Sequence, residues 1–192
     1  MIWYVARAGG VVAYLLLTFT VCIGIGLAGR ARVPGFPRFA VNDLHRFAGI
    51  LTGSFIVIHV GAILLDGYVH FSIPQVLVPL TSSYRTLAVA FGIVAAELLI
   101  ALAVTNRLRK KLPHRIWRRF HYLNFAVWAL ATTHGITAGT DNTALWLLAT
   151  YVAAIATVGG LAWWRFAEPA NAGSSGVPVS NHITRTISDS AS

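Results

Sequence analysis

Four of the seven histidines in this chain lie in or beside long apolar stretches, at two nearly equal spacings. His45 and His59 are 14 residues apart, and His121 and His134 are 13 residues apart. Ionisable side chains are costly within membrane spans, so their presence there indicates a function. Imidazole is a good ligand for haem iron, and histidines on two facing helices can bind one iron from both sides. The pattern therefore predicts haem ligation.

The segments that carry these histidines are predicted to be membrane helices. Of 192 residues, 56% are hydrophobic and 11% are charged, which is too apolar for a soluble domain of this length. A helix needs about 20 apolar residues to cross a hydrocarbon core of about 30 Å. Five such stretches are present: Gly9 to Ala28, Phe47 to Leu65, Leu87 to Val104, Phe120 to Ala138 and Thr143 to Trp164.

The expected fold is therefore all-α: a polytopic membrane helix bundle of about five transmembrane helices, with six possible, that binds haem between helices. Residues 1–166 form the expected membrane domain, and residues 167–192 an expected disordered tail. The apolar segment Ile73 to Leu80 is framed by Pro74 and Pro79 and is too short to cross, so it is predicted to be an interfacial loop. Cys22 is the only cysteine, which excludes an intrachain disulfide and a cysteine-ligated iron–sulfur site.

Basic residues indicate the orientation of the chain in the membrane. The net charge of +9 would suggest nucleic acid in a soluble protein, but here the basic residues flank apolar stretches and no nucleic-acid partner is expected. By the positive-inside rule the two basic loops face the cytoplasm, with the N-terminus outside and the C-terminus inside. These loops contain Arg30, Arg32, Arg38 and Arg46, and Arg107, Arg109, Lys110, Lys111, Arg115, Arg118 and Arg119.

This orientation pairs the histidines by depth. Both histidine-bearing spans run outward, so His45 and His121 lie near the cytoplasmic face, while His59 and His134 lie in the outer leaflet. At about 1.5 Å per residue, the two pairs are separated by ~21 Å along the helix axis, one in each leaflet. Two stacked haem sites are the layout expected for moving electrons across a bilayer.

Helical geometry complicates this arrangement in the fourth span. At about 100° per residue, 14 residues fall about 40° short of four turns, but 13 fall about 140° short. The histidines of the fourth span therefore do not share an ideal face. Either this span is distorted, with Thr132 and Thr133 as the expected place, or the two haems are offset sideways.

Several neighbours of the histidines have expected roles. Gly49, Thr52 and Gly53 share a face with the second-span histidines and leave room for a flat macrocycle. Trp128 could lie between the two haems, as packing or as an electron path. Three arginines at the cytoplasmic ends could hold the propionates of the inner haem, or could serve topology alone; these are Arg46, Arg118 and Arg119.

Glu97 is the only carboxylate well inside a predicted span. We expect it to be buried, as a proton relay or quinone-site residue, or to form a structural hydrogen bond between helices.

Two segments resemble the ferric-reductase-like transmembrane domain shared by ferric reductases and NADPH oxidases. They are LHRFAGILTGSFIVIHV, with His45 and His59, and HRIWRRFHYLNFAVWALATTHG, with His121 and His134. The resemblance covers roughly Ala6 to Trp164. It implies that His45 and His121 ligate an inner haem b, and that His59 and His134 ligate an outer one. The chain is more distantly similar to bacterial methionine sulfoxide reductase haem subunits, in which the position of His45 is not usually histidine.

The resemblance implies a b-type cytochrome of a bacterial plasma membrane and an oxidoreductase component without catalytic side chains of its own. No glycine-rich phosphate loop is present, so no flavin or NADPH site is expected in this chain. Electrons would come from a separate cytoplasmic flavoprotein reductase or a quinol, and would pass to an extracytoplasmic acceptor such as ferric iron or a flavin protein. The alternatives are a histidine-lined transition-metal transporter and a non-catalytic membrane scaffold.

Overall fold

The computed structural model describes residues 1–28, 37–67, 69–139 and 144–167, and within these ranges it is helical without strands. The expected all-α class is thereby confirmed. Arg30, Arg32, Asn142 and residues 168–192 lie outside the described residues. The helices are α1 (Ile2–Ala28), α2 (Arg38–Leu65), α3 (Ile73–Leu77), α4 (Thr86–Arg107), α5 (His114–His121), α6 (Leu123–Ala138) and α7 (Leu145–Ala167).

Four of these helices, α1, α2, α4 and α7, are long and apolar enough to cross a membrane. They correspond to four of the five predicted spans, and the chain is a multi-pass membrane protein. The remaining predicted span, Phe120 to Ala138, is divided: α5 ends at His121, and the 16-residue α6 begins at Leu123. The apolar segment after α2 forms only the five-residue helix α3, where the Ser72 backbone N–H donates a hydrogen bond to Gln75 Oε1 at 3.0 Å.

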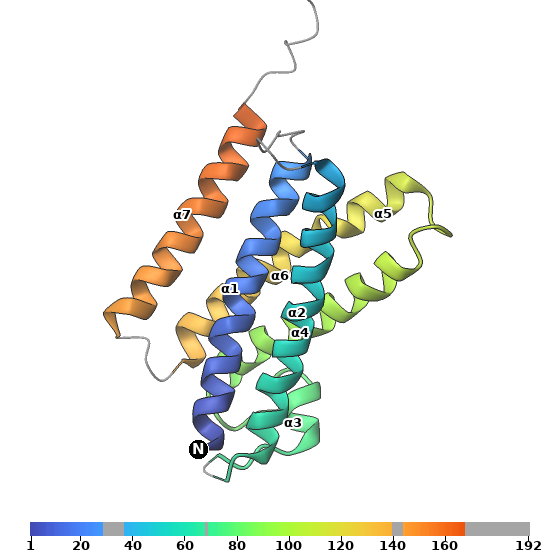
Figure 1. The fold of residues 1–192 in the computed structure, drawn as a ribbon. Helices are drawn as coiled ribbons and strands as arrows, with labels where there is room; N and C mark the ends of the chain where they lie inside the picture. The colour runs from blue at the N-terminus through green and yellow to red at the C-terminus, as the bar shows by residue number, and fades with distance from the viewer. Residues whose placement is uncertain (29–36, 68, 140–143, 168–192) are drawn as a thin grey trace, which may run out of the picture.

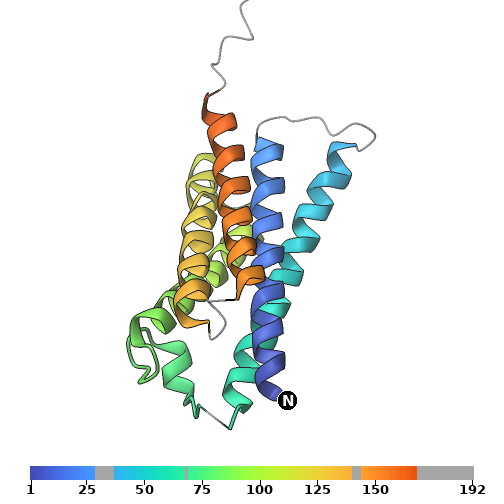
Figure 2. The ribbon, with the colours of Figure 1, turned by 90° about the vertical axis from the view of Figure 1, so that its left-hand side faces the viewer.

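The helix pairs that matter for the site are α1 with α2 and α4 with α6, which pack side by side (Figure 1). α1 also contacts α6 and α7, so it lies at the centre of the bundle (Figure 2). The N-terminus and α3 lie at one end of the bundle, and α5 and the last turns of α7 at the other. α1 therefore contacts helices from both halves of the chain.

Apolar side chains from four helices form the core around α1. Leu17 and Val21 of α1 pack with Leu102 of α4, Val127 of α6 and Val158 of α7. Because lipid is as apolar as these side chains, close packing and hydrogen bonds between helices stabilise the bundle, each bond by about 0.6 kcal/mol.

Two hydrogen bonds of this kind join α1 to α6. Trp128 Nε1–H donates to Thr18 Oγ1 at 3.0 Å, and Thr132 Oγ1 donates to the Tyr14 hydroxyl at 3.2 Å. They fix the depth of α6, and therefore of His134, relative to α1.

Candidate functional site

The structure brings the four histidines together in the two predicted pairs. The ring centroids of His45 on α2 and His121 on α5 are 6.2 Å apart, with an angle of 66° between the ring planes. The centroids of His59 on α2 and His134 on α6 are 6.3 Å apart, at 78°. All four side chains are half-buried. We call His45 and His121 the inner pair, and His59 and His134 the outer pair.

These separations fit one metal ion between the two rings of each pair. Imidazole nitrogen binds zinc, a first-row ion, at about 2.0 Å. A five-membered ring with bonds of about 1.33 Å places its centre about 1.1 Å from each atom. If both rings turned a nitrogen toward an ion midway between them, their centroids would be about 6.2 Å apart, which agrees with the 6.2 and 6.3 Å of the two pairs. In the described ranges no group of three or more His, Cys, Asp or Glu could hold a metal ion. Each site thus offers two axial ligands, which suits a metal whose other ligands come from a macrocycle.

Three of the four histidines are held by backbone carbonyls of a neighbouring helix. The Nδ1 atom lies 3.1 Å from Thr20 O in His45, 2.6 Å from Ala6 O in His59 and 2.8 Å from Ala88 O in His134. Because a carbonyl oxygen only accepts, Nδ1–H must be the donor. The lone pair of the neutral ring is then on Nε2. Metal-binding histidines that coordinate through Nε2 adopt this tautomer, with the second nitrogen fixed by a hydrogen bond.

His121 is held differently, by side chains. Its ring stacks on Trp117 with centroids 5.1 Å apart and 22° between the planes. Trp117 Nε1–H donates to Asn106 Oδ1 on α4 at 2.9 Å. The Asn124 amide donates to the His121 carbonyl at 2.8 Å and lies 3.4 Å from His121 Nδ1. The position of this ring therefore depends on side chains of α4, α5 and α6.

The break at Tyr122 accounts for the unequal helical phase of His121 and His134. The Phe125 N–H donates to Tyr122 O at 3.1 Å, an i→i+3 contact that interrupts the regular ladder. The two histidines belong to different helices, so the ideal 100° rotation does not apply between them. The distortion was predicted at Thr132 and Thr133. That location is wrong, because both residues lie within the continuous α6.

Open space lies beside two glycines of α2 that stand between its two histidines in the sequence. A Cβ atom added to Gly49 or Gly53 would meet no atom within 4 Å. Thr52, by contrast, is buried and donates to Ala48 O at 2.8 Å, so it packs against the bundle. The structure therefore has open space beside these two glycines and not beside the threonine, and the fit of a macrocycle there stays a prediction.

The three arginines predicted to hold propionates are exposed. Arg46 is next to His45 and lies 3.9 Å from Asp43 in an exposed ion pair. Arg118 and Arg119 are on α5, within one turn of His121. All three therefore lie at the inner end of the site, and their contact with a propionate stays a prediction.

Glu97 and Trp128 lie in different environments, the first at the protein surface and the second against the core. Glu97 lies on the protein surface of α4, a helix that is apolar enough to cross a membrane, and its proton or quinone role stays a prediction. Trp128 packs in the core with its Nε1–H on Thr18, which is a packing role.

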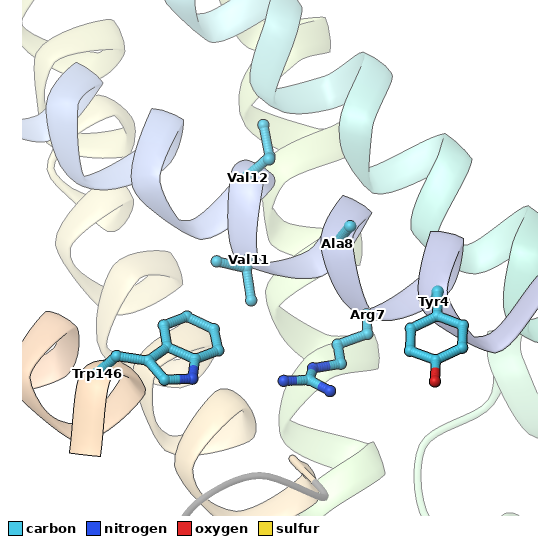
Figure 3. Close-up of a pocket in the computed structure, with 6 residues that line it drawn as sticks. All are labelled: Tyr4, Arg7, Ala8, Val11, Val12 and Trp146. Carbon is cyan, nitrogen blue, oxygen red and sulfur yellow. The ribbon is translucent and has the colours of Figure 1, made fainter. Parts of the chain in front are cut away.

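A separate groove of about 520 Å³ lies on α1 near its N-terminus (Figure 3). The Arg7 guanidinium is 5.3 Å from the Trp3 ring centroid and 5.9 Å from that of Trp146 on α7. A cation against indole rings is typical of residues that anchor helix ends at the membrane interface. None of the lining residues belongs to a histidine pair; they are Tyr4, Arg7, Ala8, Val11, Val12 and Trp146.

Sequence reasoning missed the groups that hold the histidines. Acceptors such as Ala6 O and Ala88 O are backbone atoms, so no side-chain pattern marks them. Trp117 could have been found, because it lies four residues before His121 and side chains at that spacing meet on a helix.

Residues 9–132 match the family described as ferric reductase like transmembrane component. This range includes His45, His59 and His121, and it ends two residues before His134. No curated protein and no solved structure matches the chain.

Proposed function

The chain belongs to the ferric reductase like transmembrane component family, and on this premise we propose that it is a b-type cytochrome that moves electrons across the bilayer on two haems. The observation that carries the proposal is the presence of two histidine pairs, each with ring centroids 6.2 or 6.3 Å apart. Membrane domains of this family generally bind haem. Two sites in line along α2 would divide the bilayer into two shorter electron-transfer distances.

In this proposal the histidines supply all the protein ligands. His45 and His121 hold the inner haem b, and His59 and His134 hold the outer one. Haem bound in this way supplies an iron that accepts and releases one electron. Because two histidine side chains would hold the iron of each haem, the site would favour electron transfer over binding of a substrate at the metal. The Nδ1–H bonds to backbone carbonyls orient the rings and make Nε2 a stronger ligand.

The polar residues around the sites would complete their environment. Arg46, Arg118 and Arg119 would bind the inner propionates with charge-assisted hydrogen bonds. The exposed position of Glu97 on α4 supports a contact with a quinone or a proton-carrying partner at the lipid-facing surface.

Donor and acceptor follow from the proposed orientation. By the positive-inside rule, α5 and its basic residues would face the cytoplasm, and the proposed membrane is a bacterial plasma membrane. A separate flavoprotein reductase or a quinol would reduce the inner site, and ferric iron or a flavin protein outside would be reduced at the outer site. This chain would then be the membrane component of an oxidoreductase, with no flavin or NADPH site of its own.

The two other hypotheses have less support. A transition-metal transporter would need clusters of ligands, whereas the described residues place the histidines in twos. A non-catalytic scaffold gives no reason for both pairs to share one ring separation.

The test is a reduced-minus-oxidised optical spectrum of the detergent-purified protein with a measured haem-to-protein ratio. We expect a b-type spectrum and about two haems per chain, and none in a variant with all four histidines changed to alanine. A wild-type protein that contains no haem, although it was produced with ample haem, would refute the proposal.

A further inference from the structure

Three of the four site histidines lie against a glycine of the neighbouring helix. A Cβ atom added to Gly10 would lie 2.9 Å from His59 Nδ1, and one added to Gly92 would lie 2.7 Å from His134 Nδ1. At Gly24 the added atom would lie 3.3 Å from His45 Cε1. Real Cβ atoms are almost never within 3.0 Å of another heavy atom, so alanine at Gly10 or Gly92 would require the imidazole to move.

Each of these glycines has the same relation to the carbonyl that its histidine uses. Gly10 lies four residues after Ala6, Gly24 four after Thr20, and Gly92 four after Ala88. In an α-helix the carbonyl of residue i points toward residue i+4, whose Cβ is tilted back toward the helix N-terminus. A side chain at i+4 therefore covers that carbonyl, and glycine leaves it open to a second donor.

We infer that Gly10, Gly24 and Gly92 are positioning residues, which expose the carbonyls of Ala6, Thr20 and Ala88 to the Nδ1–H groups of the site histidines. The same arrangement occurs three times on two helices, α1 and α4, although the sequences around the glycines differ. Because each glycine has no side chain, the edge of the imidazole ring can approach the helix at that point. The carbonyl one turn earlier then accepts the Nδ1–H, and Nε2 is the nitrogen without a proton. The effect on haem rests on the proposed function, whereas the effect on the tautomer does not.

Alanine at these positions should have graded effects. In Gly92→Ala and Gly10→Ala the added Cβ atom would lie 2.7 and 2.9 Å from the Nδ1 atom of the histidine. The ring must therefore move, and its hydrogen bond to the backbone carbonyl is lost. Gly24→Ala meets a ring carbon at 3.3 Å, which a small shift relieves. Loss of the hydrogen bond behind a metal-binding histidine typically weakens metal affinity by about 10- to 100-fold. We expect that loss for Gly92→Ala and Gly10→Ala, and a several-fold smaller one for Gly24→Ala.

The chain offers matched controls. A Cβ atom added to Gly26 on α1 would meet nothing within 4 Å. Gly9, next to Gly10, faces the His59 backbone at an ordinary 3.4 Å. Alanine at either position changes helix propensity in the same way, and the atoms nearest to the added Cβ at Gly9 are the N, Cα and Cβ atoms of His59 and not its ring atoms.

The experiment measures the histidine tautomers first and haem second. ¹⁵N NMR of the haem-free protein, labelled on histidine, reports which ring nitrogen carries the proton. Wild type, Gly9→Ala and Gly26→Ala should show protonated Nδ1 at His45, His59 and His134, and Gly92→Ala should lose that signal for His134 alone. Haem affinity and the low-spin EPR signal of the loaded protein should change in the same variants.

The results separate the inference from the proposed function. If wild-type protein binds no haem, the function fails, but the tautomer measurement still tests the glycines. Unchanged His134 tautomer and haem affinity in Gly92→Ala would overturn the inference, as would equal changes in Gly26→Ala. Should Gly92→Ala fail to fold, Gly24→Ala, with its milder contact, must show the smaller shift at His45 or the inference is wrong.

Discussion

The outer and inner histidine pairs have nearly the same ring separation but are held by different kinds of group. In the outer pair, both His59 and His134 donate Nδ1–H to carbonyls of α1 and α4. In the inner pair, His45 does the same toward Thr20, but His121 is held by a stack on Trp117. A backbone acceptor cannot move without its helix, whereas a side-chain partner can change rotamer. The outer site is therefore preorganised by the bundle, and the inner site is adjustable.

The difference follows from the helices that carry the ligands. His134 lies within α6, which packs along α4, whereas His121 lies at the end of the eight-residue α5. On α4, Gly92 admits the His134 ring, but near the other end of the same helix Asn106 binds Trp117 instead. An adjustable inner site, beside the basic residues of α5, is the one that the proposed cytoplasmic donor would meet.

The largest expected effect separates the two sites completely. His59→Ala and His134→Ala should each remove only the outer haem, and His45→Ala and His121→Ala only the inner one, because in the proposed function each pair would hold the iron of its own site. The haem-to-protein ratio should fall from about two to about one in each variant. Loss of both haems on removal of one histidine would show that the sites are not independent.

Removal of the stack should weaken the inner site alone. An aromatic contact contributes about 0.5–1.5 kcal/mol, so Trp117→Ala should weaken inner-haem binding by up to about tenfold. Trp117→Phe keeps a ring and should retain most of the affinity. Haem titration of the purified variants, followed by redox titration, distinguishes the sites. An equal loss at the outer site would contradict the contrast between the pairs.

Asn106→Ala should have a smaller effect on inner-haem affinity, because Asn106 acts on His121 by holding the Trp117 side chain. A neutral hydrogen bond contributes about 1 kcal/mol, so inner-haem affinity should fall by about fivefold. Phenylalanine at position 117 has no N–H to donate, so Asn106→Ala should cause no further loss in a Trp117→Phe background. A full additional loss in the double variant would mean that Asn106 acts by another route.

The smallest effect is expected from the exposed arginines. Arg118→Gln and Arg119→Gln remove cationic charge near His121 at a surface where single ion pairs contribute little. Inner-haem affinity should fall by about two- to fivefold, and less at high salt because exposed charges are screened. Affinity titrations at two salt concentrations test this. A change at the outer site, or none at low salt, would argue against contact with inner propionates.

The sequence predicted the paired histidines because ionisable side chains in apolar segments are costly and therefore indicate a function. It predicted four of the spans because each is an apolar stretch long enough to cross a membrane. It did not reveal the break at Tyr122, because apolar residues continue on both sides of it. The side of α4 on which Glu97 lies was likewise not predicted, because its neighbours in the sequence are all apolar. The carbonyls of Ala6, Thr20 and Ala88 are backbone atoms, so no side-chain pattern marks them. The role of the glycines one turn later can be recognised only once the packing of the two helices is known.

Electron transfer across sealed vesicles tests the central claim most directly. Haem-loaded protein in liposomes that contain ferricyanide should carry electrons from dithionite added outside, and the trapped ferricyanide should lose its colour. We predict this for wild type and not for His45→Ala or His59→Ala, since each lacks one of the two sites. Equal rates in wild type, both variants and protein-free vesicles would contradict the account.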